Sequence, residues 1–99
     1  MEWQRRRYAL VALAESFSAA VSEDDRFIVW DYVDHNELGI AYDHLLYRLF
    51  DEPLAEVAVN TGQVGQLLAL GKALAHEAES DIVYRVFLEQ FFPGELGTT

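Results

Sequence analysis

The side chains best suited to bind a metal ion or move a proton are three histidines among many acids. His35 follows Asp31 by four residues, so the two can share a helix face, and His76 is close in sequence to Glu77 and Asp81. A zinc site needs three or four converging ligands. The sequence contains no cysteine, no His-Glu-x-x-His and no Glu-x-x-His. We therefore expect histidines at the surface beside acids, with no bound metal and no cofactor.

Other motifs of catalysis are incomplete. A phosphate-binding loop needs four residues between its first glycine and a Gly-Lys pair, followed by Ser or Thr. Here five residues separate Gly65 from Gly71, and Ala73 follows Lys72. There is no Gly-x-Ser-x-Gly, and the acids fall at predicted caps, turns and polar faces rather than in a recognisable pocket pattern. We predict that the protein is not an enzyme.

The charge balance limits the class of partner. The chain carries 17 acids and 7 bases, for a net charge of −10. A nucleic-acid binder needs a basic surface, so nucleic acid and anionic membranes are not expected partners. The acidic excess serves either solubility or a basic protein partner. It is concentrated between Glu15 and Asp43, where Arg26 is the one base. The absence of cysteine fits a reducing cytoplasm.

Helical patterns run through the whole chain and predict one all-α domain, residues 1–99, folded as a compact bundle of about five helices with short connections. We expect helices over Glu2 to Ala20, Phe27 to Val33 after a start at Ser22, Glu37 to Phe50, Val64 to Ala75, and Ile82 to Phe91. We predict a helix cap at Ser22, a second at Thr61, and a flexible tail over 94–99. Gly71 within a helix suggests that another helix packs closely against it.

The stretch from Asp34 to Phe50 has the strongest pattern. After a turn signal, apolar side chains recur at spacings of three and four, at Leu38, Ala41, Leu45 and Leu49. This spacing predicts a helix with one face on the core. The opposite face carries polar residues, namely Glu37, Asp43, His44 and Arg48.

This segment resembles the central motif of the MafI-like immunity proteins. The motif positions are occupied by Glu37, Gly39, Ala41, Leu45, Leu49 and Glu52, and the family's closing Leu-Gly helix is similar to Leu67, Leu70, Gly71 and Leu74. The similarity runs from about Ser22 to Leu74. The acid-rich segment usual before the family's last helix is replaced here by residues 57–62. The resemblance implies a small cytoplasmic helical protein that neutralises a bacterial toxin by tight binding.

A toxin that attacks nucleic acid has a basic cleft, which an acidic protein can fill. We expect such an interface on the second and third helices. Its acids are predicted to be Asp31, Asp34, Glu37 and Asp43, and its aromatic anchors Trp30, Tyr32 and Tyr42. For each aromatic residue, packing in the core is the competing interpretation.

Other readings remain open from the sequence. The same acidity suits an adaptor or regulatory protein-binding module, from host or phage, that has no toxin partner. A small enzyme or metal protein would be revealed by stoichiometric metal in the purified protein. The apolar content is compatible with a monomer or with a helix-paired homodimer.

Overall fold

The computed structural model describes residues 2–50, 60–76 and 81–96. Within them the chain forms α1 (Glu2–Ser16), α2 (Glu23–Asp34), α3 (Leu38–Phe50), α4 (Thr61–Ala73), α5 (Ile82–Phe91) and a short 3-10 helix, η1 (Pro93–Leu96). The prediction of an all-α bundle is confirmed. Of the residues named in the motif, Glu52 lies outside the described part of the chain.

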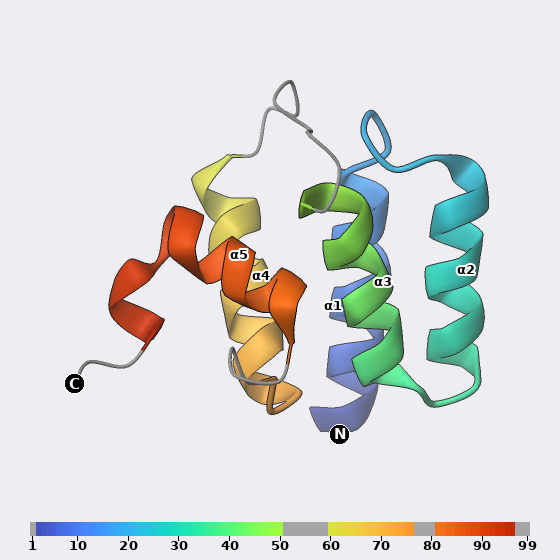
Figure 1. Ribbon diagram of the computed structural model, residues 1–99. Coiled ribbons are helices and arrows are strands. Elements are labelled where there is room, and N and C mark those ends of the chain that lie inside the picture. The colour runs from blue at the N-terminus through green and yellow to red at the C-terminus, as the bar shows by residue number, and fades with distance from the viewer. Residues whose placement is uncertain (1, 51–59, 77–80, 97–99) are drawn as a thin grey trace.

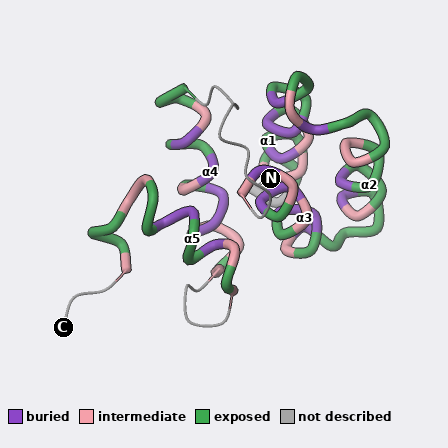
Figure 2. Tube along the Cα trace, turned by 45° about the horizontal axis from the view of Figure 1, so that its top comes forward, coloured by how far each residue is buried: buried purple, intermediate pink, exposed green. Residues whose placement is uncertain are grey.

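Helix α3 lies at the centre of the bundle (Figure 1). It packs against α1, α2 and α5, while α1 also packs against α2 and α4. Helix α2 stands at one side of the molecule, and its outer edge is exposed (Figure 2). No helix among the described residues has the length and apolar composition needed to cross a membrane.

The predicted stripe of α3 forms the middle of the core. Leu38, Ala41, Leu45 and Leu49 are all buried. Because burial removes apolar surface from water, each of the three leucines contributes about 1.5–3 kcal/mol. The amphipathic pattern therefore identified both the helix and its inward face.

The start of α2 follows its sequence signal. Ser22 accepts a hydrogen bond from the backbone N–H of Asp25, and three acids occupy the first turn. This cap and the helix dipole outweigh the strand propensity of the aromatic and β-branched residues that follow. The helix ends at a turn in which Asn36 has a φ of 65°, a conformation that Asn tolerates better than most residues.

Two predicted boundaries are wrong. Helix α1 ends at Ser16 rather than Ala20, since the Ser16 hydroxyl bonds to the Leu13 carbonyl and competes with the helix ladder. Phe17 and Val21 are buried in the turns that follow. The cap of α4 is Asn60 rather than Thr61, because Asn60 and Gln63 form a reciprocal capping box.

A short helical turn follows α5 at Pro93–Leu96. Part of the expected flexible tail forms η1, and Leu96 packs against the core. Residues 97–99 lie outside the described part of the chain. The close approach inferred at Gly71 is confirmed, because the rings of Tyr42 and Tyr84 lie against it.

Candidate functional site

The predicted interface residues lie in three different places. Tyr42 is fully buried and its hydroxyl donates to the backbone carbonyl of Leu67. It is therefore a core residue, and its prediction as a surface anchor is wrong. The hydroxyl finds a buried partner in α4, and burial raises the pKa of Tyr42 far above its usual value.

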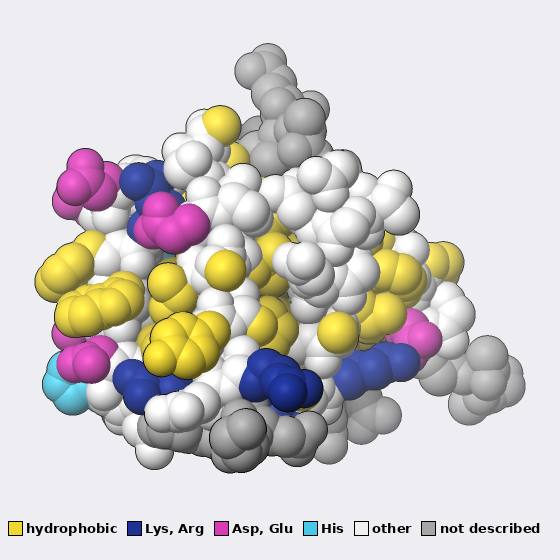
Figure 3. All heavy atoms as spheres, turned by 180° about the vertical axis from the view of Figure 1, so that it is seen from behind, with side chains coloured by type: hydrophobic (Ala, Val, Ile, Leu, Met, Phe, Trp, Pro, Cys, Tyr) yellow, Lys and Arg dark blue, Asp and Glu magenta, His cyan; other side chains and the backbone are white. Residues whose placement is uncertain are grey.

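The outward face of α2 carries exposed aromatic side chains. Phe27 and Trp30 are 61% and 48% exposed, and their ring centroids are 5.8 Å apart. Tyr8 of α1 is also exposed and, with Trp30, lines a small cavity of about 180 Å³ between α1 and α2. Figure 3 shows hydrophobic side chains gathered over α2, with acidic side chains on both sides of them.

The acids of this face come from both ends of α2. We call the aromatic–acidic surface the set Tyr8, Glu23, Phe27, Trp30, Asp31 and Asp34, all of them exposed. The spacing of Glu23, Phe27, Trp30 and Asp34 places them along one face of the helix. Of the predicted residues, Trp30, Asp31 and Asp34 belong to this surface.

Two contacts reduce the negative charge of the aromatic–acidic surface. Arg7 of α1 approaches Asp34, with 3.9 Å between Nη2 and Oδ1. His35 donates from Nδ1 to the backbone carbonyl of Asp31. This hydrogen bond and the Asp31 carboxylate raise the pKa of His35. Protonation of His35 therefore makes the surface less negative in mild acid.

Some of the acidic excess has an internal role. Asp25 accepts hydrogen bonds from Arg48 Nε at 3.0 Å and from Ser22 Oγ at 2.9 Å, and lies 3.1 Å from His44 Nε2. Burial opposes ionisation of Asp25, but these contacts outweigh it and its pKa is lowered. His44 and Arg48, predicted on the polar face of α3, thus hold α2 against α3.

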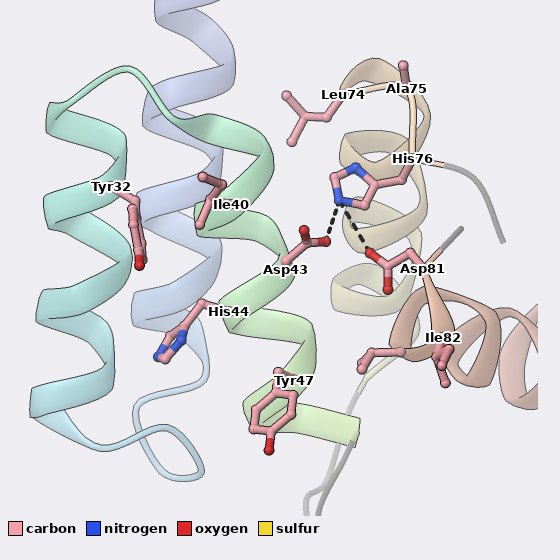
Figure 4. Close-up of a pocket in the computed structure, with 11 residues that line it drawn as sticks. Tyr32, Ile40, Asp43, His44, Tyr47, Leu74, Ala75, His76, Asp81 and Ile82 are labelled. Carbon is pink, nitrogen blue, oxygen red and sulfur yellow. Dashed lines mark hydrogen bonds and ion pairs between the residues drawn. The ribbon is translucent and has the colours of Figure 1, made fainter. Parts of the chain in front are cut away.

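Asp43 and Tyr32 point toward a second region. Both line an open pocket of about 650 Å³ between α2, α3, the end of α4 and the start of α5. In Figure 4 Asp43 points toward His76 and Asp81, and away from α2. Glu37 is exposed in the turn before α3. The four predicted acids therefore do not form one surface.

His76 is the centre of a polar cluster at this pocket. Its Nε2 lies 2.6 Å from Asp43 Oδ1 and 3.7 Å from Asp81 Oδ2. The His76 side chain is only 8% exposed. Its ring packs edge-on against Tyr42 and Tyr84, with centroids 4.7 and 5.6 Å apart. The expectation of a surface histidine is therefore wrong for His76.

The end of α4 sets the position of His76. The backbone N–H groups of His76 and Ala75 bond to the carbonyls of Gly71 and Lys72 respectively. This pair of bonds is the Schellman motif, which needs a left-handed residue after the cap. Ala75 takes that role with a φ of 59°, although glycine is preferred there.

Asp81 is held by the start of α5, where its Oδ1 accepts a hydrogen bond from the Tyr84 N–H at 3.0 Å. Burial and the neighbouring Asp81 carboxyl raise the pKa of Asp43 to about 6. Burial also opposes ionisation of Asp81, but the hydrogen bonds that Asp81 makes with Asp43 and with the Tyr84 backbone outweigh it and lower the pKa of Asp81. The two carboxyls therefore differ in acidity, with Asp43 the weaker acid and Asp81 the stronger.

Sequence reasoning missed this cluster because its members come from three elements. Asp43 and His76 are 33 residues apart, and no local motif joins them. The closeness of His76 and Asp81 in the sequence was the one available signal. That closeness does not show that the end of α4 directs the His76 imidazole toward Asp43 of α3.

Comparisons with known proteins add no identity to this geometry. No protein-family model matches the chain, and neither the curated proteins nor the solved structures contain a match. The similarity to the MafI-like immunity proteins therefore stays a prediction from the sequence.

Proposed function

We propose that the protein binds a basic protein partner through the aromatic–acidic surface, and that this partner is a bacterial toxin which it neutralises in the cytoplasm. One observation carries the proposal. Phe27 and Trp30 form an exposed, contacting pair on α2, with acids at both ends of the helix. Aromatic anchors surrounded by polar residues are the usual centre of a protein interface.

The energetics favour an interface at this place. Trp and Tyr are the residue types most enriched among those that dominate binding energy. Trp30 contributes little to the core because about half of its side chain is exposed. Its burial by a partner would remove that apolar surface from water. The acids around it would accelerate encounter with a basic cleft by electrostatic steering.

That the partner is a toxin is supported by the sequence resemblance alone. An acidic adaptor or regulatory module without a toxin partner would use the same surface. The two are distinguished by the identity of the partner. A partner that is a housekeeping protein would favour the adaptor.

Coexpression with the protein encoded beside this gene tests the proposed function. We expect that neighbour to stop cell growth when produced alone and the present protein to restore growth and copurify with it. A matched variant, Ile82→Ala, alters an exposed apolar side chain on α5 and should protect equally well. A non-toxic neighbour, or toxicity that persists without complex formation, would contradict the proposal.

Salt should act on the rate of association. Raising the ionic strength from about 0.02 to 0.5 M shortens the screening length. The association rate constant should then fall by about 10-fold or more, with a much smaller change in the dissociation rate. Stopped-flow or surface-based kinetics measures both rates. An association rate that does not depend on salt would mean that the acids serve solubility alone.

A further inference from the structure

We propose that Asp43, His76 and Asp81 bind a divalent transition-metal ion at the edge of the pocket of about 650 Å³, where α3 meets the end of α4 and the start of α5. The ligand atoms are Asp43 Oδ1, His76 Nε2 and Asp81 Oδ2. One ligand atom from each of the three residues lies within 4.8 Å of the other two. Figure 4 shows the imidazole nitrogen aimed at both carboxylates.

The spacing of these atoms suits such an ion. Zinc bonds to nitrogen and carboxylate oxygen are about 2.0–2.2 Å long, which places ligand atoms about 3.3 Å apart in a tetrahedral site. The two measured separations from His76 Nε2, 2.6 and 3.7 Å, lie on either side of that value. Small rotations of the two aspartate side chains would therefore admit the ion.

Each ligand is positioned by its own element. The Schellman motif at the end of α4 fixes the His76 backbone, with Ala75 held in a left-handed conformation. Such backbone strain costs about 1–3 kcal/mol and clusters at functional sites. Asp81 uses Oδ1 to cap α5, which leaves Oδ2 directed at His76. The site is therefore assembled by the fold rather than by a mobile surface cluster.

The burial of His76 adds an independent observation. Its side chain is more than nine-tenths buried, and its Nδ1 has no hydrogen-bond partner among the described residues. Within that part of the chain, the polar contacts of the ring are those that Nε2 makes with the two carboxylates. Nε2 shares a hydrogen bond with Asp43 Oδ1 and lies 3.7 Å from Asp81 Oδ2, and a bound cation would take the place of the proton between these atoms.

The ligand set indicates the class of metal. Two carboxylates and a neutral imidazole balance the charge of a divalent ion. Imidazole favours zinc, iron, nickel and copper, whereas calcium and magnesium prefer all-oxygen sites. Three protein ligands leave a coordination position free, and the adjoining pocket gives it access to solvent.

A direct interaction of His76 with the two acids, without metal, is the competing explanation. In it, the imidazole contacts Asp43 of α3 and Asp81 at the start of α5 and so links the two helices. The two explanations differ in whether the wild-type protein takes up an ion in a defined ratio. Calorimetric titration of chelator-treated protein with zinc chloride at about pH 7.5 measures this ratio. We expect one zinc ion per chain.

Asp81→Asn is the sharpest variant because Asn caps helices about as well as Asp, so α5 keeps its start. We expect it to lower zinc affinity at least about 10–100-fold, the range for losing even an outer-shell partner. Asp43→Asn should act in the same way. His35→Ala removes an exposed histidine that also lies beside an acid and should leave zinc binding unchanged. Circular dichroism checks that each variant is folded.

Cobalt gives a readout that does not depend on the variants. Co²⁺ bound to the wild-type protein should show the visible absorption of a low-coordinate nitrogen and oxygen site, and zinc should displace it. Binding should weaken from pH 7.5 to 6, because the ion competes with protons on these ligands. Absence of stoichiometric zinc and cobalt binding by the wild type would overturn the proposal. Zinc binding retained in both aspartate variants, or lost in His35→Ala, would also overturn it.

Discussion

Gly71→Ala is expected to destabilise the protein by about 2 kcal/mol, a small-to-large change in a packed core. A Cβ at this position would lie 2.6 Å from Tyr84 Cε1 and 2.8 Å from the Tyr42 hydroxyl oxygen. Both tyrosines are buried, so neither ring can move aside without disturbing the core. The better helix propensity of alanine, worth about 1 kcal/mol, offsets only part of this cost.

Gly65 provides the matched control in the same helix. Nothing lies within 4 Å of a Cβ built on it, and it is exposed. Gly65→Ala should therefore stabilise the protein by about 0.5–1 kcal/mol. Urea unfolding gives both free energies, and the melting temperature of Gly71→Ala should fall by about 10 °C. Equal effects of the two substitutions would show that Gly71 is not a contact point between helices.

Trp30→Ala is expected to weaken binding of the proposed toxin partner about 30-fold or more, which corresponds to at least 2 kcal/mol. The reason is that an aromatic side chain at the centre of an interface carries a large share of the buried area. Phe27→Ala should have a smaller effect, because it leaves the indole ring of Trp30 in place and removes only the neighbouring ring that supports it. Isothermal titration calorimetry or binding kinetics measures the loss.

Two controls separate this effect from damage to the fold. Trp30 is about half exposed, so its removal should change the unfolding free energy far less than the binding free energy. Ile82→Ala removes a side chain that is 80% exposed on α5 and should leave affinity unchanged. A partner that binds the Trp30 variant as tightly as wild type would exclude the aromatic–acidic surface as its main contact.

The sequence predicts the fold well where the determinants are local. The spacing of Leu38, Ala41, Leu45 and Leu49 reports which face of one helix meets the core, and the Ser22 cap depends on residues a few positions away. The end of α1 was missed because it depends on tertiary burial of Phe17 after the Ser16 hydroxyl interrupts the helix. The periodic spacing of apolar residues does not predict that the helix ends at Ser16.

The candidate site was predicted only in part. Trp30, Asp31 and Asp34 share α2, and helical spacing alone places them near one another. Helical spacing places Tyr42 beside the inward stripe of α3, which favours burial, but the buried acceptor of its hydroxyl is the Leu67 carbonyl of α4 and has no local sequence signal. Asp43 was misassigned because the partner that orients it, His76, comes from the end of α4. The role of a residue that depends on a contact between two helices cannot be predicted from the pattern of one helix.

Chemical footprinting of Trp30 tests the central claim, that the aromatic–acidic surface binds a basic protein, most directly. Hydroxyl-radical oxidation of the free protein should modify Trp30 and Phe27 readily, since both are exposed. In the complex, we predict that oxidation of both falls several-fold while oxidation of Ile82 on α5 stays the same. A stable complex in which Trp30 is oxidised as fast as in the free protein would contradict the proposed interface.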